Sequence, residues 1–119
     1  MPSCRRGGSN SNHDRSAMIF LVRSTIRPGA TDHPDWPQLL EQERVQGREL
    51  HASGVVKHVW RVPGRYEAVT IFDVHSTEEL DKILWTLPLW RFMDIQVEAL
   101  AVHYYDNPEA TRFEDIVTT

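Results

Sequence analysis

Cysteine is almost absent from this sequence of 119 residues, because Cys4 is the only one. An intrachain disulfide is therefore impossible, and the composition fits a reducing compartment such as the cytoplasm. No apolar run approaches the roughly 18–20 residues that span a membrane, and the first residues lack the apolar segment of a secretory signal. We therefore expect a cytoplasmic protein that does not contact a membrane.

An excess of positive charge is also missing. The chain carries 13 Lys and Arg against 17 Asp and Glu, which gives a net charge of −4. Binding to DNA or RNA requires clustered basic side chains that contact phosphates, so we expect no nucleic-acid partner. A small anionic ligand is still compatible with this charge, since a few arginines inside a pocket can outweigh the net field.

The common motifs for metals, nucleotides and acyl transfer are absent as well. The sequence has no HExxH, no cysteine pair, no GxGxxG, no P-loop and no GxSxG. Its six histidines are scattered without the short spacing of metal ligands. We therefore expect no metal, no nucleotide cofactor and no serine nucleophile.

The chain divides into a leader, one domain and a tail, because its length suits a single domain. Residues 1–17 are rich in Gly, Ser, Asn and Arg. Such a segment buries too little apolar surface to become ordered, so we predict a disordered leader, unless the start codon is Met18. The domain is expected over 18–106, and the acidic tail over 107–119 could contact a partner.

Hydrophobic patterns and breakers predict six elements in the order β-α-β-β-α-β. Asp35 and Pro37 favour a helix start and Gly54 a helix end, while Ser76 and Glu79 form a capping box. The predicted strands cover 18–26, 55–62, 66–74 and 94–103, and the predicted helices cover 36–53 and 77–87.

This order is typical of a ferredoxin-like α+β subunit, with an antiparallel sheet and two helices on one face. The uncovered face requires contact with another copy, so the pattern predicts a dimer or a larger homo-oligomer of the dimeric α+β barrel type.

One acidic residue lies on the apolar side of the first predicted helix. Glu43 is four residues from both Leu39 and Gly47, and seven from Leu50, so it falls on the inward stripe. A carboxylate there is costly unless it is paired or functional. It either pairs with a nearby arginine or reaches water, or it is a buried base with a raised pKa that abstracts protons.

The predicted hairpin gathers aromatic and polar side chains. Strand alternation puts His58 and Trp60 on one face of its first strand, and Tyr66, Ala68 and Thr70 on one face of its second. Together they would line an apolar pocket with a few hydrogen-bond donors. A purely structural hairpin is the alternative, because such residues favour strands in general.

These segments together resemble the muconolactone Δ-isomerase family. The resemblance is carried by HVWRVPGRY at 58–66, IFDV at 71–74, LPLWRFMDIQVEAL at 87–100, the opening MIFLVRSTI and the pair Glu43-Arg44. It implies a ferredoxin-like subunit, sheet-paired dimers in a ring-like decamer, and no cofactor. The implied reaction shifts a ring double bond, converting muconolactone to the 3-oxoadipate enol-lactone in aromatic catabolism.

The resemblance also assigns roles to residues. Glu43 is the expected base, with Tyr66 and His58 as donors to the developing oxyanion. Arg61, with Arg44 second, is the expected clamp for the substrate carboxylate, because a guanidinium fits a carboxylate in fork geometry. Arg61 could instead pair with Asp73 or Asp94. Two further residues, Trp60 and Thr70, are expected to line the substrate pocket.

The chain departs from the family pattern at two places. Ala68, Val69 and Thr70 stand where the family typically has Asn-Tyr-Ser, and Trp90-Arg91 stands where Phe-Pro often follows LPL. Ala68 removes an amide from the expected pocket, which favours a larger or less polar substrate. A cofactor-free cyclase or oxygenase on the same scaffold is the alternative enzyme, and a ligand-binding or assembly module is the non-catalytic one.

Overall fold

The computed structural model describes residues 18–106. The predicted leader and tail lie outside the described residues. The strands are β1 (Met18–Ile26), β2 (Val56–Arg61), β3 (Glu67–Val74) and β4 (Met93–Leu100), and the helices are α2 (Trp36–Ala52) and α3 (Thr77–Thr86). Three short 3₁₀ helices are η1 (Ala30–Asp32), η2 (Trp90–Phe92) and η3 (Tyr104–Asp106).

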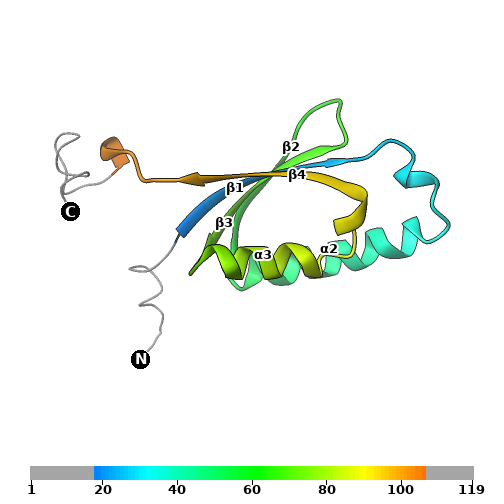
Figure 1. Ribbon diagram of the computed structural model, residues 1–119, viewed down its shortest axis with the longest axis horizontal. Helices are drawn as coiled ribbons and strands as arrows, with labels where there is room; N and C mark the ends of the chain where they lie inside the picture. The colour runs from blue at the N-terminus through cyan, green and yellow to red at the C-terminus, as the bar shows by residue number, and fades with distance from the viewer. Residues whose placement is uncertain (1–17, 107–119) are drawn as a thin grey trace.

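The four strands form one antiparallel sheet in the order β2-β3-β1-β4. Both helices lie on the same face of this sheet (Figure 1). The ferredoxin-like βαββαβ arrangement predicted from the sequence is therefore confirmed. In the described part of the chain, no helix is both long enough and apolar enough to cross a membrane.

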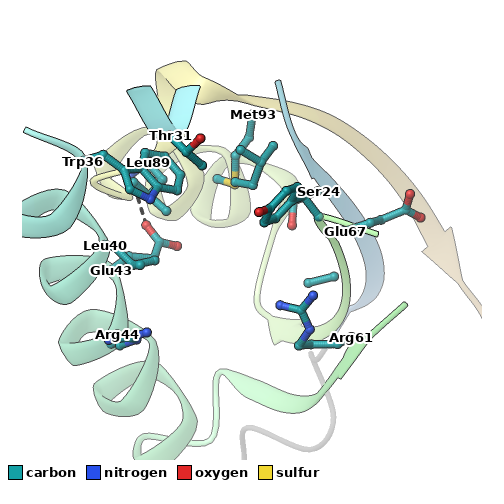
Figure 2. A pocket seen from close by; sticks show the side chains of 13 residues that line it. Ser24, Thr31, Trp36, Leu40, Glu43, Arg44, Arg61, Glu67, Leu89 and Met93 are labelled. Atoms are coloured by element: carbon teal, nitrogen blue, oxygen red, sulfur yellow. Dashed lines mark hydrogen bonds between the residues drawn. The ribbon is translucent and has the colours of Figure 1, made fainter. Parts of the chain in front are cut away.

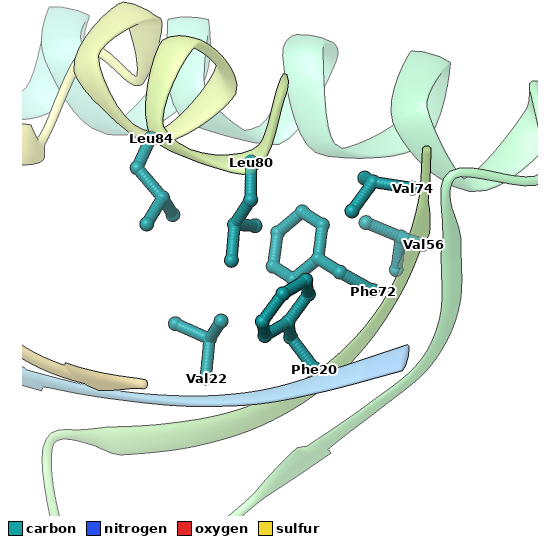
Figure 3. Close-up of a cluster of buried hydrophobic side chains, with 7 residues drawn as sticks. All are labelled: Phe20, Val22, Val56, Phe72, Val74, Leu80 and Leu84. Atoms are coloured by element: carbon teal, nitrogen blue, oxygen red, sulfur yellow. The ribbon is translucent and has the colours of Figure 1, made fainter. Parts of the chain in front are cut away.

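The core fills the space between the sheet and α3. Alternate residues of β1 and β3 face the helices, and they meet two leucines that α3 presents one turn apart (Figure 3). These buried residues are Phe20, Val22, Val56, Phe72, Val74, Leu80 and Leu84.

The helix boundaries follow the predicted signals with one exception. Ser76 Oγ accepts the Glu79 N–H at 3.0 Å, so the predicted cap at Ser76 is confirmed, but Glu79 Oε1 accepts the N–H of His75 at 2.6 Å and not that of Ser76, so the box is displaced by one residue. Gly54 follows α2 with a φ of 87°, a conformation that suits glycine. Asp35 precedes α2 as predicted, but its side chain makes no capping hydrogen bond.

A β-bulge in β2 changes which side chains face the helices. The register pairs Val56 with Phe72, but it then pairs His58 with Ile71 and Val59 with Thr70. The extra residue at Lys57 shifts the later side chains to the opposite face. The prediction that His58 and Trp60 share a face with Tyr66 and Thr70 is therefore wrong.

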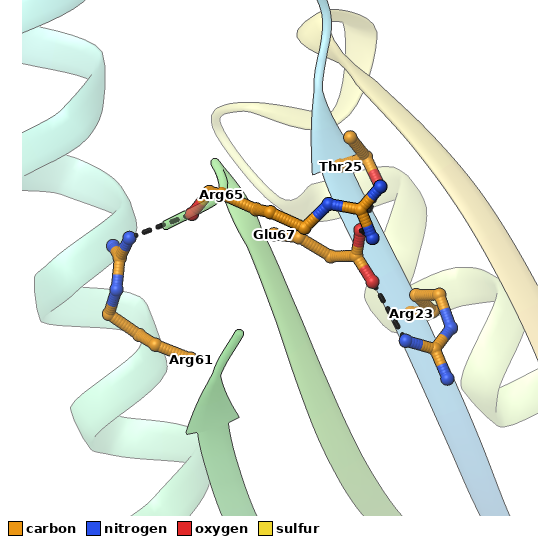
Figure 4. A network of polar contacts seen from close by, with 5 residues as sticks. All are labelled: Arg23, Thr25, Arg61, Arg65 and Glu67. Carbon is orange, nitrogen blue, oxygen red and sulfur yellow. Dashed lines mark hydrogen bonds and ion pairs between the residues drawn. The ribbon is translucent and has the colours of Figure 1, made fainter. Parts of the chain in front are cut away.

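The sheet face away from the helices carries ion pairs, which Figure 4 shows, beside partly exposed apolar side chains of β1 and β3. Glu67 Oε2 accepts a hydrogen bond from Arg23 Nη1 at 2.7 Å, and Arg65 lies 3.7 Å from the other carboxylate oxygen. The bond from Arg23 is the main reason that the pKa of Glu67 is lowered. This arrangement ties β1, β3 and the hairpin turn together on that face.

Candidate active site

A cavity of about 560 Å³ lies between α2, the β2–β3 hairpin and the segment before β4 (Figure 2). This volume is within the roughly 300–1,000 Å³ that is usual for small-molecule sites. We call it the main cavity. It is lined by Ser24, Ile26, Thr31, Trp36, Leu40, Glu43, Arg44, Arg61, Tyr66, Glu67, Ala68, Leu89 and Met93.

Glu43 reaches the main cavity from α2, as its place on the apolar stripe predicted. One carboxylate oxygen, Oε1, accepts the backbone N–H of Leu89 at 3.1 Å. Within residues 18–106, no ion pair joins Glu43 to an arginine, so the pairing alternative is not observed. The carboxylate is thus held at one oxygen, and Oε2 has no hydrogen-bond partner among the described residues.

The surroundings of Glu43 change its acidity in a defined direction. Burial among apolar side chains disfavours the charged form and raises the pKa of Glu43, while the hydrogen bond from Leu89 opposes this effect and is the smaller influence. A half-buried carboxylate with a raised pKa is suited to accept a proton from carbon and to return it.

Two arginines lie at the edge of the main cavity. Arg44 projects from α2 and contacts Glu41 at 3.4 Å, in a pair whose side chains are both largely exposed. Such a surface pair is weak, so Arg44 can exchange it for a ligand carboxylate. Arg61 projects from β2, and its Nη2 donates to the Arg65 carbonyl at 2.9 Å.

The structural alternative for Arg61 is not observed. Asp73 lies 3.7 Å from Lys57, and Asp94 Oδ1 accepts from Arg27 Nε at 2.9 Å, so both predicted partners contact other cations. The single hydrogen bond of Arg61 to a carbonyl leaves further guanidinium donors for a ligand. Arg44 and Arg61 therefore place two cations around one opening, as expected for an anionic ligand.

The other predicted site residues divide into three that line a cavity and two that do not. Tyr66 lines the main cavity at its exposed rim, with 68% of its surface accessible. Ala68 also lines it, whereas Thr70 lines a neighbouring hollow deeper under the helices. His58 and Trp60 stack on each other at 5.2 Å on the opposite sheet face, and neither lines the main cavity.

Sequence reasoning missed several parts of this cavity. The Leu89 N–H is a backbone group, which no residue pattern identifies as a donor. Ser24 could have been found, because strand alternation puts it on the helix-facing side with Phe20 and Val22. Met93 borders the cavity where β4 begins. Among residues 18–106, no group of His, Cys, Asp and Glu is arranged to hold a metal ion.

The fold and this cavity define a class of protein: a ferredoxin-like α+β enzyme that presents a carboxylate and two arginines to a small ligand. The family model for muconolactone delta-isomerase matches residues 18–106. The chain belongs to the muconolactone delta-isomerase family, and the resemblance seen in the sequence is confirmed.

Individual relatives agree with this assignment. The chain is 37% identical over 99 residues to the muconolactone delta-isomerase of Acinetobacter baylyi, covering 82% of this chain and 99% of that protein. It is 39% identical over 89 residues to the enzyme of Rhodococcus opacus, covering 74% and 96%. It is also similar to a crystal structure of muconolactone isomerase, with a TM-score of 0.67 and 34% identity over 80% of this chain and 96% of that one.

These names favour an isomerase over the cyclase, oxygenase and non-catalytic alternatives.

Proposed function

We propose that this protein shifts a carbon–carbon double bond within an unsaturated lactone of the muconolactone type, by proton transfer without a cofactor. The relatives named muconolactone delta-isomerase support the reaction class. The observation that carries the proposal is Glu43, a half-buried carboxylate with one hydrogen bond in a cavity that two arginines border.

Glu43 is the base that becomes the acid. Its Oε2 removes the proton from the ring carbon next to the lactone oxygen, and the electron pair left behind delocalises through the ring to the carbonyl oxygen. The protonated Glu43 then returns a proton to the ring carbon nearer the carbonyl. The hydrogen bond from Leu89 to Oε1 fixes the side chain, so one carboxylate can reach both carbons.

The developing negative charge requires donors, and the carboxylate arm of the substrate requires a cation. Tyr66 lies at the rim of the main cavity, and Ser24 lines its sheet wall, so these hydroxyls are the proposed donors to the oxyanion. Arg44 and Arg61 bind the carboxylate arm at the opening. His58, which the sequence favoured as a donor, lies outside this cavity and has no part in the proposal.

The setting of the reaction is also part of the proposal. We place the enzyme in the cytoplasm because the sequence offers no disulfide pair, and in aromatic catabolism because the relatives are named muconolactone delta-isomerase. We also propose a homo-oligomer that covers the sheet face opposite the helices. The partly exposed Ile19, Leu21, Val69 and Ile71 at the centre of that face support this assembly.

A spectroscopic assay tests the proposed reaction. The purified full chain is incubated with muconolactone while the ultraviolet spectrum is followed, and the product is identified by nuclear magnetic resonance. We expect the enol-lactone to form at a rate proportional to enzyme concentration and unchanged by prior treatment with a chelator. A spectrum that changes no faster than that of the buffer control would contradict the proposed function.

A further inference from the structure

A second hollow adjoins the main cavity. It has a volume of about 210 Å³, and we call it the inner cavity. Four residues border both hollows: Ser24, Glu43, Ala68 and Met93. The proposed base therefore lies on the border between the two spaces, with the arginines on the side of the main cavity only.

The two hollows differ in chemistry. The inner cavity lies between the helices and the sheet, and its walls include Val22, Leu50, Val59, Phe72, Leu84 and Ile95. Among the described residues that line it, Thr70 is the one polar side chain away from the border with the main cavity. A hollow with such walls gains little from water and takes up apolar groups. The inner cavity is thus suited to a hydrocarbon group and not to a charged one.

A glycine in the middle of α2 keeps this hollow open. Gly47 lines the inner cavity one helical turn after Glu43. Glycine is the poorest helix former after proline, so its presence inside a helix calls for a reason. A Cβ built at Gly47 would meet nothing within 4 Å, so no neighbouring atom requires the glycine. The absence of a side chain at Gly47 instead leaves room beside Glu43, the proposed base.

We propose that the substrate carries an apolar group of a few carbons on its lactone ring, which fills the inner cavity, and that Gly47 sets the room for it. This inference rests on the proposed function. When the lactone ring lies at Glu43 and its carboxylate arm points toward Arg44 and Arg61, the apolar group has to be attached to one of the two ring carbons joined by the double bond. The carbon beside the ring oxygen already carries the arm and the proton that Glu43 removes.

The test compares five lactones and three proteins. The substrates are muconolactone and its homologues with methyl or propyl on either double-bond carbon. The proteins are the wild type, Gly47→Leu, which fills the inner cavity, and Gln42→Leu, which puts the same side chain on an exposed position of α2. For the wild type we expect kcat/KM to rise roughly 10-fold on adding the first carbon, the usual effect of a methylene in an apolar pocket.

The expected result for Gly47→Leu is a loss of this preference, with the ratio of kcat/KM for the propyl and unsubstituted lactones falling at least about tenfold. Gln42→Leu should keep the wild-type ratio. If the wild type turns over muconolactone as well as or better than every homologue, the inference is overturned and the proposed function stands. An equal ratio in Gly47→Leu and wild type also overturns it. If no lactone reacts, the proposed function itself fails.

Discussion

Glu43 and Leu89 are 46 positions apart in the chain, yet a hydrogen bond of 3.1 Å joins the Glu43 carboxylate to the Leu89 backbone N–H. The bond links α2 to the turn that follows α3, and it holds the carboxylate at the wall of the main cavity. Because the donor is a neutral N–H, it orients the carboxylate without the strong stabilisation that an arginine would give. Glu43 thus stays basic enough to accept a proton.

The acidity of Glu43 predicts the pH dependence of turnover. A base must be deprotonated in the free enzyme, so kcat/KM falls as the pH drops through the Glu43 pKa. Burial raises this pKa from its ordinary value of 4.5, so the midpoint of the acid limb should lie above 4.5. Initial rates with muconolactone across the acid range give the midpoint. A limb centred below 4.5 would show that another group controls the rate.

The two arginines predict a specific loss of substrate affinity. Replacing Arg61 or Arg44 with Gln removes a charged donor to the substrate carboxylate, which is worth about 1.5–3 kcal/mol. We expect KM to rise by roughly 10- to 100-fold with a smaller change in kcat, because binding is lost in the ground state and the transition state alike. Arg48→Gln is the matched control, since Arg48 is exposed on α2 and lines neither cavity. Unchanged KM values in Arg61→Gln and Arg44→Gln would show that neither arginine binds the substrate carboxylate.

The ion pairs of Glu67, on the sheet face away from the helices, predict how stability depends on pH. The folded-state pKa of Glu67 is lowered, mainly by the hydrogen bond from Arg23, so its ionised form stabilises the fold. This contribution is present above the unfolded value near 4.5 and is lost as the pH falls through the lower, folded pKa. The melting temperature of Glu67→Gln should therefore fall less than that of the wild type as the pH drops through this range. Glu98→Gln, an exposed change on β4, should follow the wild type.

The uncovered sheet face predicts association. Sedimentation at micromolar concentration should give a mass above that of one 13.8 kDa chain. Trp60 lies exposed on this face, so Trp60→Ser should weaken association by about tenfold or more if it is an interface anchor. Trp85, which is exposed on α3, is the control position. A monodisperse monomer of the wild type would contradict the proposed assembly.

The sequence predicted the order of elements well because local signals define them. The helix cap at Ser76 and the turn at Gly54 are properties of a few adjacent residues, and both appear as expected. Strand ends were less certain: β4 ends at Leu100 and not at His103, because pairing with β1 stops there. Pairing partners, unlike caps, are far apart in the chain.

The site was predicted only in part, because some of its features depend on local sequence and others on contacts between distant segments. Helical spacing put Glu43 on the inward face correctly. The bulge at Lys57 has no clear signature, since no glycine marks it, and it reversed the faces of His58 and Trp60. The backbone donor at Leu89 and the inner cavity beside Gly47 depend on how α2 packs over the sheet, which only the folded chain defines.

The most direct test of the central claim is the turnover of muconolactone by Glu43→Gln. The amide keeps the shape of the side chain and can still accept the Leu89 N–H, but it cannot take a proton from carbon. We expect kcat to fall by roughly 10²–10⁴ while the melting temperature stays at or above that of the wild type, because a charge with a raised pKa is removed. Glu49→Gln, an exposed change on the same helix, should keep wild-type rates. Wild-type kinetics in a folded Glu43→Gln would contradict Glu43 as the base.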